Sequence, residues 1–457
     1  MAETSLRAPA PDRGGGQPDG GADRVPLSFQ QQFLTEVDHG DGLGPFGPHY
    51  TIVGGWRVSG EVHLATLRAA LDDVVARHEA LRTRIVLDDG EPYQTVVPPV
   101  SPSLEVHDLE PGCPVERDRC AEEFVNEVEA GTFGLHEVPL VRALLGRFDR
   151  DNSVLVLAAH HTAVDGWSVH VVVRDLAECY AARREHRAPH LPPVRQYREY
   201  VTWQRANGAP AAARAFWRDT LRGQQVVTIP TDMPRRDHEP FETGWHRFMI
   251  GDPLRSAALT LAEATHSSPF MVLFAAYLVS LRESSGRSDL VVPTFTPGRT
   301  PAWVHDTVGS FYNLLPLRAD IGGSGDFAAV VARTRAACLA TYPHEVPFMQ
   351  LAEEAPELMR PAMEPDAALC VFQVTQSPHV VRGAEAGGLR YTAIRKRELS
   401  QPAGSQIPDG VLFGLELHPQ GLVGSIGYTT NLFTERTIAA MASHYTRVLS
   451  AQLGCVG

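Results

Sequence analysis

Lysine, cysteine and long hydrophobic runs are all scarce in this sequence of 457 residues. Only one of its 41 basic residues is a lysine, Lys396, and 54 acidic residues bring the net charge to −13. An acidic chain lacks the basic face that binds nucleic acid or an anionic membrane. We therefore expect neither a nucleic-acid partner nor a membrane partner.

The cysteines and the hydrophobic segments exclude further classes. No two of the six cysteines form a CxxC pair, and no Cys/His spacing matches a zinc site. The most apolar stretch, residues 270–281, is too short to span a bilayer, and the N-terminus has no apolar segment typical of a secretory signal. These observations predict a cytoplasmic protein with reduced thiols and no bound metal.

The hydrophobic content and the distribution of Pro, Gly and Arg indicate a globular protein in two lobes. Hydrophobic residues make up 43% of the chain, whereas residues 1–24 are rich in Pro, Gly and Ala and are expected to form a disordered tail. An Arg- and Pro-rich segment predicts a boundary between an N-terminal lobe, 25–185, and a C-terminal lobe, 186–457. The segment 377–408 is long, Gly-rich and polar, and a loop of that length in a compact protein is usually functional or disordered.

Hydrophobic periodicity locates the regular elements. Helices are expected at 61–79, 115–130, 167–183, 268–283, 327–341 and 435–453. Strands are expected at 140–148, 153–159 and 290–296, with a hairpin at 83–97. Helices and strands alternate in both lobes, which predicts an α/β fold.

The sharpest feature is HHTAVDG at residues 160–166, which follows an apolar run and precedes a predicted helix. Adjacent side chains of a strand point to opposite faces, so His160 and His161 cannot both address one reactant. We expect one to face a cleft and the other the packed interior. Asp165 and Gly166 then form the turn into the next helix, where backbone N–H groups are free.

Other interpretations of this motif stay open on the residues alone. A histidine at a strand end is more often structural than catalytic. Two histidines with a nearby carboxylate also occur in metal sites, but neighbours on opposite faces do not readily chelate one ion. A serine hydrolase is disfavoured because the sequence contains no GxSxG.

Seven segments, HHTAVDG among them, resemble in their order the motifs of nonribosomal peptide synthetase condensation domains, which belong to the chloramphenicol-acetyltransferase-like superfamily. The others are PLSFQQQ (26–32), RHEALRT (77–83), YREYVTWQR (197–205), PGR with VGSFYN (297–299 and 308–313), HEVPFMQL (344–351) and YTTNLF (428–433). The resemblance extends over nearly the whole chain after the tail.

The resemblance implies an α/β fold of two chloramphenicol-acetyltransferase-like lobes, which form a V-shaped pseudo-dimer with a central tunnel. The C-terminal lobe would carry a floor loop near 294–313 and the bridging loop near 377–408. One carrier protein would present the acyl donor from one side of the tunnel, and the acceptor would enter from the other.

The resemblance also implies a role for each residue of the motif. His161 matches the catalytic residue that faces the tunnel centre, and His160 matches a structural one. Asp165 matches a residue that forms a salt bridge with the floor-loop arginine, here Arg299. Gly166 matches a catalytic position whose backbone lies near the thioester carbonyl.

Three further positions, Trp167, Ser168 and Asn313, match residues that line the tunnel. Acyl transfer from a thioester needs a base for the proton of the nucleophile and donors for the oxyanion, and histidine serves as such a base near neutral pH. With no activated Ser or Cys nearby in sequence, direct attack is favoured over a covalent acyl-enzyme. Whether His161 removes a proton or mainly positions the acceptor stays open.

The resulting prediction is a free-standing condensation enzyme, because no adenylation or carrier domain is recognised in the chain. It would take an aminoacyl or β-aminoacyl group from the phosphopantetheine of a separate carrier protein and give it to a small alcohol or amine. It would act as a monomer with no bound cofactor. The composition and the N-terminal tail resemble those of the ester-forming condensation enzymes of enediyne antibiotic pathways in actinomycetes. The sequence leaves open which donor and acceptor are used and whether the bond formed is an ester or an amide.

Three alternatives share the fold. CoA-dependent O-acyltransferases also carry HHxxxDG, but the DFGWG sequence of their plant-type members is absent here. Epimerisation domains carry an EGHGR-like sequence, which is also absent. A non-catalytic module that recruits an oxygenase usually has a degraded histidine motif, whereas this one is intact.

Overall fold

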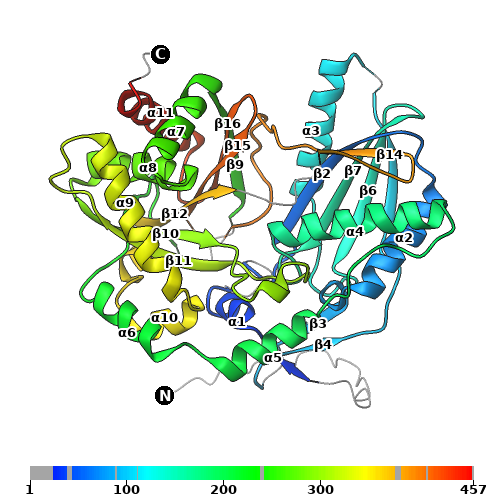
Figure 1. Cartoon of the computed structure of the whole chain (residues 1–457), viewed down its shortest axis with the longest axis horizontal. Coiled ribbons are helices and arrows are strands. Elements are labelled where there is room, and N and C mark those ends of the chain that lie inside the picture. The colour runs from blue at the N-terminus through cyan, green and yellow to red at the C-terminus, as the bar shows by residue number, and fades with distance from the viewer. Residues whose placement is uncertain are drawn as a thin grey trace, which may run out of the picture.

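The computed structural model describes residues 24–38, 44–87, 90–110, 112–236, 241–375, 382–407 and 410–454. Two lobes stand side by side, each with a mixed sheet and helices packed on it (Figure 1). The predicted two-lobed α/β class is therefore confirmed. Except for Arg24, the predicted tail lies outside the described residues.

The first lobe is built on a six-stranded sheet of order β13-β14-β2-β7-β6-β5. Neighbouring strands are antiparallel except β5 and β6, which run parallel. The strands are β2 (Thr51–Ser59), β5 (Leu104–Asp108), β6 (Val141–Arg147), β7 (Asn152–His160), β13 (Arg382–Ala386) and β14 (Leu389–Ala393). The last two come from much later in the chain than the rest of their sheet.

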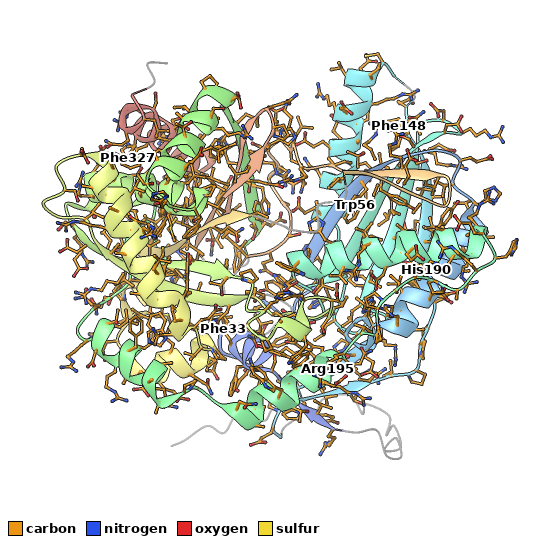
Figure 2. All side chains as sticks on the ribbon, viewed as in Figure 1. Phe33, Trp56, Phe148, His190, Arg195 and Phe327 are labelled. Carbon is orange, nitrogen blue, oxygen red and sulfur yellow. The ribbon has the colours of Figure 1, made fainter. Side chains whose placement is uncertain are left out.

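Strand β7 shows why helices cover both faces of this sheet. Its odd-numbered residues 155–159 share a core with α2 (Leu64–Arg77) and α4 (Gly166–Arg184). Its even-numbered residues 154–158 share a second core with α3 (Pro114–Ala130). A strand covered on both sides needs this continuous apolar run. Trp56 of β2 lies in the core with α4 (Figure 2).

The second lobe has a seven-stranded sheet of order β11-β10-β12-β15-β16-β9, with β8 beside β12. Strands β10, β12 and β15 are parallel to one another, and the other pairs are antiparallel. The strands are β8 (Thr228–Pro230), β9 (Thr243–Gly251), β10 (Asp289–Thr296), β11 (Asn313–Asp320), β12 (Ala367–Thr375), β15 (Val411–His418) and β16 (Gly421–Thr429).

A single helix, α8 (Pro269–Ser285), forms the centre of the second lobe. The Ser268 hydroxyl caps it by accepting a hydrogen bond from Met271 N at 3.3 Å, and residues 271–281 are all buried. Helices α7 (Asp252–Ala264), α9 (Phe327–Thr341) and α11 (Glu435–Gln452) pack around it. A helix that is apolar on all sides requires such a central position.

Within the described ranges, no single helix is both long and apolar enough to cross a bilayer. Helices α7 and α8 reach that length and composition only when taken together, and they meet at an angle of 110°.

The remaining elements lie along the lower side of both lobes in Figure 1. They comprise a sheet of order β1-β4-β3, four helices and four 3₁₀ turns. These elements are β1 (Val25–Pro26), α1 (Phe29–Glu36), η1 (Glu79–Arg82), β3 (Thr83–Val86), β4 (Tyr93–Val96), α5 (Tyr197–Asn207), α6 (Ala211–Thr220), η2 (Ala302–Val304), η3 (Tyr342–His344), α10 (Phe348–Glu354) and η4 (Arg360–Met363). Phe33 of α1 packs edge-on against Phe348 of α10, with ring centroids 5.2 Å apart. The N-terminal segment thereby contacts the second lobe.

Two segments of the second half of the chain cross to the first lobe. Residues 297–312, between β10 and β11, lie against the start of α4. Residues 382–407 run from the β13–β14 hairpin along α3 to β9. The predicted lobe limits and loops stay a prediction, and residues 376–381 and 408–409 lie outside the described residues.

Candidate active site

The HHTAVDG segment connects the end of β7 to the start of α4. Strand β7 ends at His160, and α4 begins at Gly166 with Asp165 as its N-cap. The Asp165 carboxylate accepts a hydrogen bond from Ser168 N at 2.7 Å, which satisfies one of the free N–H groups of the first turn. The motif thus has the strand–turn–helix geometry that its sequence indicates.

His160 lies in the interior of the first lobe and is fully buried. Its Nε2 is 3.2 Å from Gly47 O, and its Nδ1 is 2.8 Å from Thr162 Oγ1. Because a carbonyl oxygen only accepts, Nε2 carries the proton. Burial lowers the pKa of His160 to about 4, so the ring is neutral at pH 7 and holds the turn in place.

His161 instead lines a cavity between the two lobes. Its Nδ1 is 2.7 Å from Val164 O, which fixes the proton on Nδ1 and leaves Nε2 unprotonated. Nε2 has no hydrogen-bond partner among the described residues. Burial lowers the pKa of His161 below its ordinary value, so the ring is neutral and able to accept a proton at pH 7.

Two tyrosines hold the His161 ring between them. Tyr50 stacks on it with centroids 4.8 Å apart, and Tyr312 packs on it at 4.7 Å. The two hydroxyl groups are 2.6 Å apart and share a hydrogen bond. Burial raises the pKa of both tyrosines, so both are protonated. The sequence prediction missed both as site residues, although Tyr312 stands inside the VGSFYN segment.

A buried ion pair joins the motif to the loop of the second lobe. Arg299 Nη2 donates to both carboxylate oxygens of Asp165, at 2.9 and 3.2 Å, and both side chains are at most 5% exposed. Asp165 also accepts from Phe311 N at 3.1 Å. With these partners and Ser168 N, the Asp165 carboxylate is engaged in holding the turn.

Gly298 allows the loop to place Arg299. It has φ +61°, and a Cβ atom there would lie 1.8 Å from Phe311 O. A side chain at this position would therefore clash with the backbone. The Arg299 guanidinium then lies over the Phe311 ring at 4.2 Å and donates to Val304 O and Thr307 O.

The cavity has a volume of about 780 Å³ and takes its walls from both lobes. Eight of its lining residues are aromatic: Tyr50, Trp56, Trp167, Trp245, Phe270, Phe295, Tyr312 and Tyr342. Gly166 also lines it, and a Cβ atom added there would meet nothing within 4 Å. Aromatic side chains at eight positions of the wall suit a substrate with a ring.

The predicted tunnel-lining residues divide into two groups. Trp167 lines the cavity, and its Nε1 donates to His305 O at 2.9 Å. Ser168 and Asn313 are not among the described residues that line this cavity, and their assignment to the tunnel stays a prediction. The Ser168 hydroxyl donates to Gly309 O at 2.7 Å. The Asn313 amide donates to Val346 O at 2.8 Å and accepts from Phe348 N. Both side chains are buried, and each links two segments of the chain by hydrogen bonds.

Across the described ranges, no group of three or more His, Cys, Asp or Glu side chains is arranged to hold a metal ion. His160 and His161 hydrogen-bond to different backbone carbonyl groups, those of Gly47 and Val164. The five described cysteines are all free thiols.

Two α/β lobes with a histidine on the wall of the cavity between them define a chloramphenicol-acetyltransferase-like protein. Residues 23–454 match the condensation domain family. The chain belongs to this family, whose members form amide or ester bonds in nonribosomal peptide assembly.

Similar proteins and structures support the assignment to the condensation domain family. The chain is 33% identical over its full length to CymA of Salinispora arenicola, a probable non-canonical nonribosomal peptide synthetase. It is 30% identical over 94% of its length to the dimodular nonribosomal peptide synthase of Bacillus subtilis. It spans only 6% and 18% of the lengths of those two proteins.

The crystal structure of SgcC5 from Streptomyces globisporus, in complex with (R)-(-)-1-(2-naphthyl)-1,2-ethanediol and sucrose, has a TM-score of 0.90 and 45% identity, covering 94% of this chain and 98% of that one. The X-domain from teicoplanin biosynthesis, at 24% identity, has a TM-score of 0.75 over 96% of each chain, which shows the shared fold.

Proposed function

We propose that this protein is a free-standing condensation enzyme that transfers an aminoacyl or β-aminoacyl group from a carrier-protein phosphopantetheine thioester to an alcohol, forming an ester. The observation that carries the proposal is the protonation state of the His161 ring, which lies on the cavity wall. Its Nδ1 proton is bound to Val164 O, and its Nε2 is unprotonated. This is the state that a general base needs.

In the proposed step, the acceptor hydroxyl attacks the thioester carbonyl carbon as His161 Nε2 takes its proton. The C–O bond forms, the carbonyl oxygen becomes negative, and the first N–H groups of α4 at Gly166 stabilise it. The C–S bond then breaks, and the thiolate takes the proton from His161. No cofactor takes part in this step.

Direct transfer is favoured over an acyl-enzyme. The described cavity lining contains no cysteine, and its one serine, Ser405, has its hydroxyl 3.1 Å from Thr51 Oγ1 rather than at His161. Asp165 is not the base, because Arg299 and two backbone N–H groups occupy its carboxylate. His161 is therefore the group that we assign to proton transfer.

The acceptor that we propose is a small aryl 1,2-diol. The aromatic lining of the cavity supports a ring-bearing substrate, and the similar protein SgcC5 was crystallised with a naphthyl ethanediol. We place the reaction in the cytoplasmic biosynthesis of an antibiotic of the enediyne type, with a carrier protein acting in trans and the enzyme as a monomer.

A reconstitution tests the proposal. An aryl β-aminoacyl group is attached to a stand-alone carrier protein and, in parallel, to CoA, and each is mixed with the protein and 1-phenyl-1,2-ethanediol or the matching amino alcohol. Mass spectrometry then identifies the products. Ester from the carrier thioester alone supports the proposal. Equal use of CoA indicates a general O-acyltransferase, amide alone indicates an amine acceptor, and no product with any donor favours a recruitment module.

A methyl group at position 166 should reduce transfer without harming the fold. In Gly166→Ala the new Cβ meets nothing within 4 Å, so the midpoint of thermal unfolding should change little. The methyl group would occupy the cavity wall where the thioester carbonyl approaches the helix N-terminus, so kcat/KM should fall at least about tenfold. Gly325→Ala, whose Cβ also meets nothing, is the matched control with unchanged kcat/KM. Full activity in Gly166→Ala would show that the carbonyl does not approach this residue.

The pH dependence of transfer should follow His161. The free base is the active form, and burial lowers its pKa, so kcat/KM should be constant at neutral pH and fall as the pH drops through that lowered value. The acid limb, measured with the carrier thioester, should therefore show one ionisation below the ordinary histidine value of about 6.5. An acid limb centred above that value is incompatible with a buried, neutral His161.

A further inference from the structure

The carboxylates on the cavity wall differ in how they are paired. Three of them line the cavity, namely Glu129, Asp165 and Glu345. A charge beside a low-dielectric cavity is costly unless an opposite charge lies close to it. We therefore compare the partners of the three groups.

Two of the three are neutralised by arginine side chains. Glu129 Oε2 accepts from Arg247 Nη2 at 2.8 Å and from Arg397 Nη2 at 2.5 Å. Burial alone would raise the pKa of Glu129, but the two arginines outweigh it and hold the pKa at about 2. Asp165 is paired with Arg299 in the same way.

Glu345 has no such partner. Its Oε1 accepts from the Thr296 hydroxyl and from Asn313 Nδ2, the latter at 3.2 Å, and both donors are neutral. Its Oε2 has no hydrogen-bond partner among the described residues, and no basic side chain among them forms an ion pair with it. The neighbouring His344 stacks on Phe216 at 4.1 Å and hydrogen-bonds Ala340 O, away from Glu345. Glu345 is thus a carboxylate on the cavity wall with one oxygen unused.

We propose that Glu345 binds the ammonium group of the aminoacyl donor, as the specificity-determining residue for an amine-bearing acyl group. This rests on the proposed transfer reaction and adds the group that recognises its donor. The substrate's cation would occupy the place that an arginine fills at Glu129 and Asp165. A hydrogen bond between two charged groups is shorter and stronger than one between neutral groups.

The pairing also decides which group attacks the thioester. A carboxylate at hydrogen-bond distance stabilises the charged form of an amine and so raises its pKa. An ammonium group has no lone pair and is not a nucleophile. The amine bound at Glu345 is therefore held unreactive, which prevents a donor from acylating itself and leaves the hydroxyl as the attacking group. An acceptor amine that must attack would not be bound there.

The test compares Glu345→Gln with the wild-type protein on two matched donors. Glutamine keeps the shape and a carbonyl oxygen for Thr296 and Asn313 while it removes the charge. The donors are carrier-bound β-phenylalanyl and 3-phenylpropionyl thioesters, which differ only in the amine, with 1-phenyl-1,2-ethanediol as acceptor. Glu357→Gln, an exposed carboxylate paired with Arg360, is the control.

For Glu345→Gln we expect kcat/KM to fall about 10- to 100-fold with the β-phenylalanyl donor and less than about threefold with the phenylpropionyl donor. An equal loss on both donors would mean that Glu345 is only a structural tie, and no loss on either would mean that it does not contact the donor. Either result overturns the proposal.

A binding measurement separates this proposal from the proposed function. Non-reactive amide analogues of the two acyl-pantetheines are titrated calorimetrically into each protein. If the wild-type protein binds the amine-bearing analogue about tenfold more tightly and Glu345→Gln loses that preference, the recognition stands even where no ester is formed. If the wild-type protein shows no preference for the amine-bearing analogue, the proposed binding of the ammonium group by Glu345 is wrong, even if the protein forms the ester.

Discussion

Replacing His161 by alanine is expected to lower kcat for ester formation by about 10²- to 10⁴-fold, the usual contribution of a positioned general base. The reason is the fixed tautomer: the Nδ1 proton is held by Val164 O, so Nε2 is the basic atom on the cavity wall. An alcohol is not deprotonated at pH 7 and needs this base. The measurement is the initial rate of ester formation from carrier-bound donor, with KM determined separately.

The control for this variant is a stability measurement. His161 stacks on Tyr50 and makes a tilted contact with Tyr312, and the loss of both ring contacts is expected to shift the unfolding midpoint only slightly. A kcat that stays within about threefold of wild type, in a folded variant, would show that His161 positions the acceptor rather than removing its proton. In that case an amine acceptor becomes the better account.

Replacing Arg299 by methionine is expected to have the largest effect on stability. It leaves the Asp165 carboxylate buried without its cation, and breaking a buried ion pair costs about 3–5 kcal/mol of unfolding free energy. It also removes the two bonds to Val304 O and Thr307 O that shape the loop. The measurement is the urea midpoint together with the denaturant slope, which should not change.

Two comparisons sharpen this second prediction. Arg222→Met removes an exposed pair with Asp219, and its effect should be within about 0.5 kcal/mol. Adding Asp165→Asn to Arg299→Met removes the unpaired charge and should restore part of the stability. If Arg299→Met is no less stable than Arg222→Met, the pair does not hold the loop on the motif.

Local sequence patterns predict much of the fold. The elements that they do not predict depend on pairing with residues far away in the chain. The helices predicted at 115–130, 268–283 and 327–341 lie within a few residues of α3, α8 and α9, because amphipathic or fully apolar runs decide them locally. Strand β7 follows from its continuous apolar run. In contrast, β13 and β14 come from a polar segment, and they are strands because β2 offers a free edge.

The site shows the same division. The placement of His160 and His161 on opposite sides follows from strand geometry alone. Tyr50 and Tyr312, 262 positions apart, meet only because the loop of the second lobe crosses to the first. Ser168 stands beside the motif in sequence, but it lies one helical turn after Asp165. Its hydroxyl donates to Gly309 O and accepts from Arg299 Nη2, so the side chain is held in the interior.

The hairpin β13–β14 also sets a condition on how the molecule is made. Strand β14 pairs with residues 56–59 of β2, so on the ribosome that edge of the first sheet stays bare until residues 389–393 have been synthesised. A bare edge of this length is a template for strands of other chains and hence for aggregation. The first lobe is therefore not a separable unit of expression, and engineering that exchanges lobes must carry residues 382–407 with the first one.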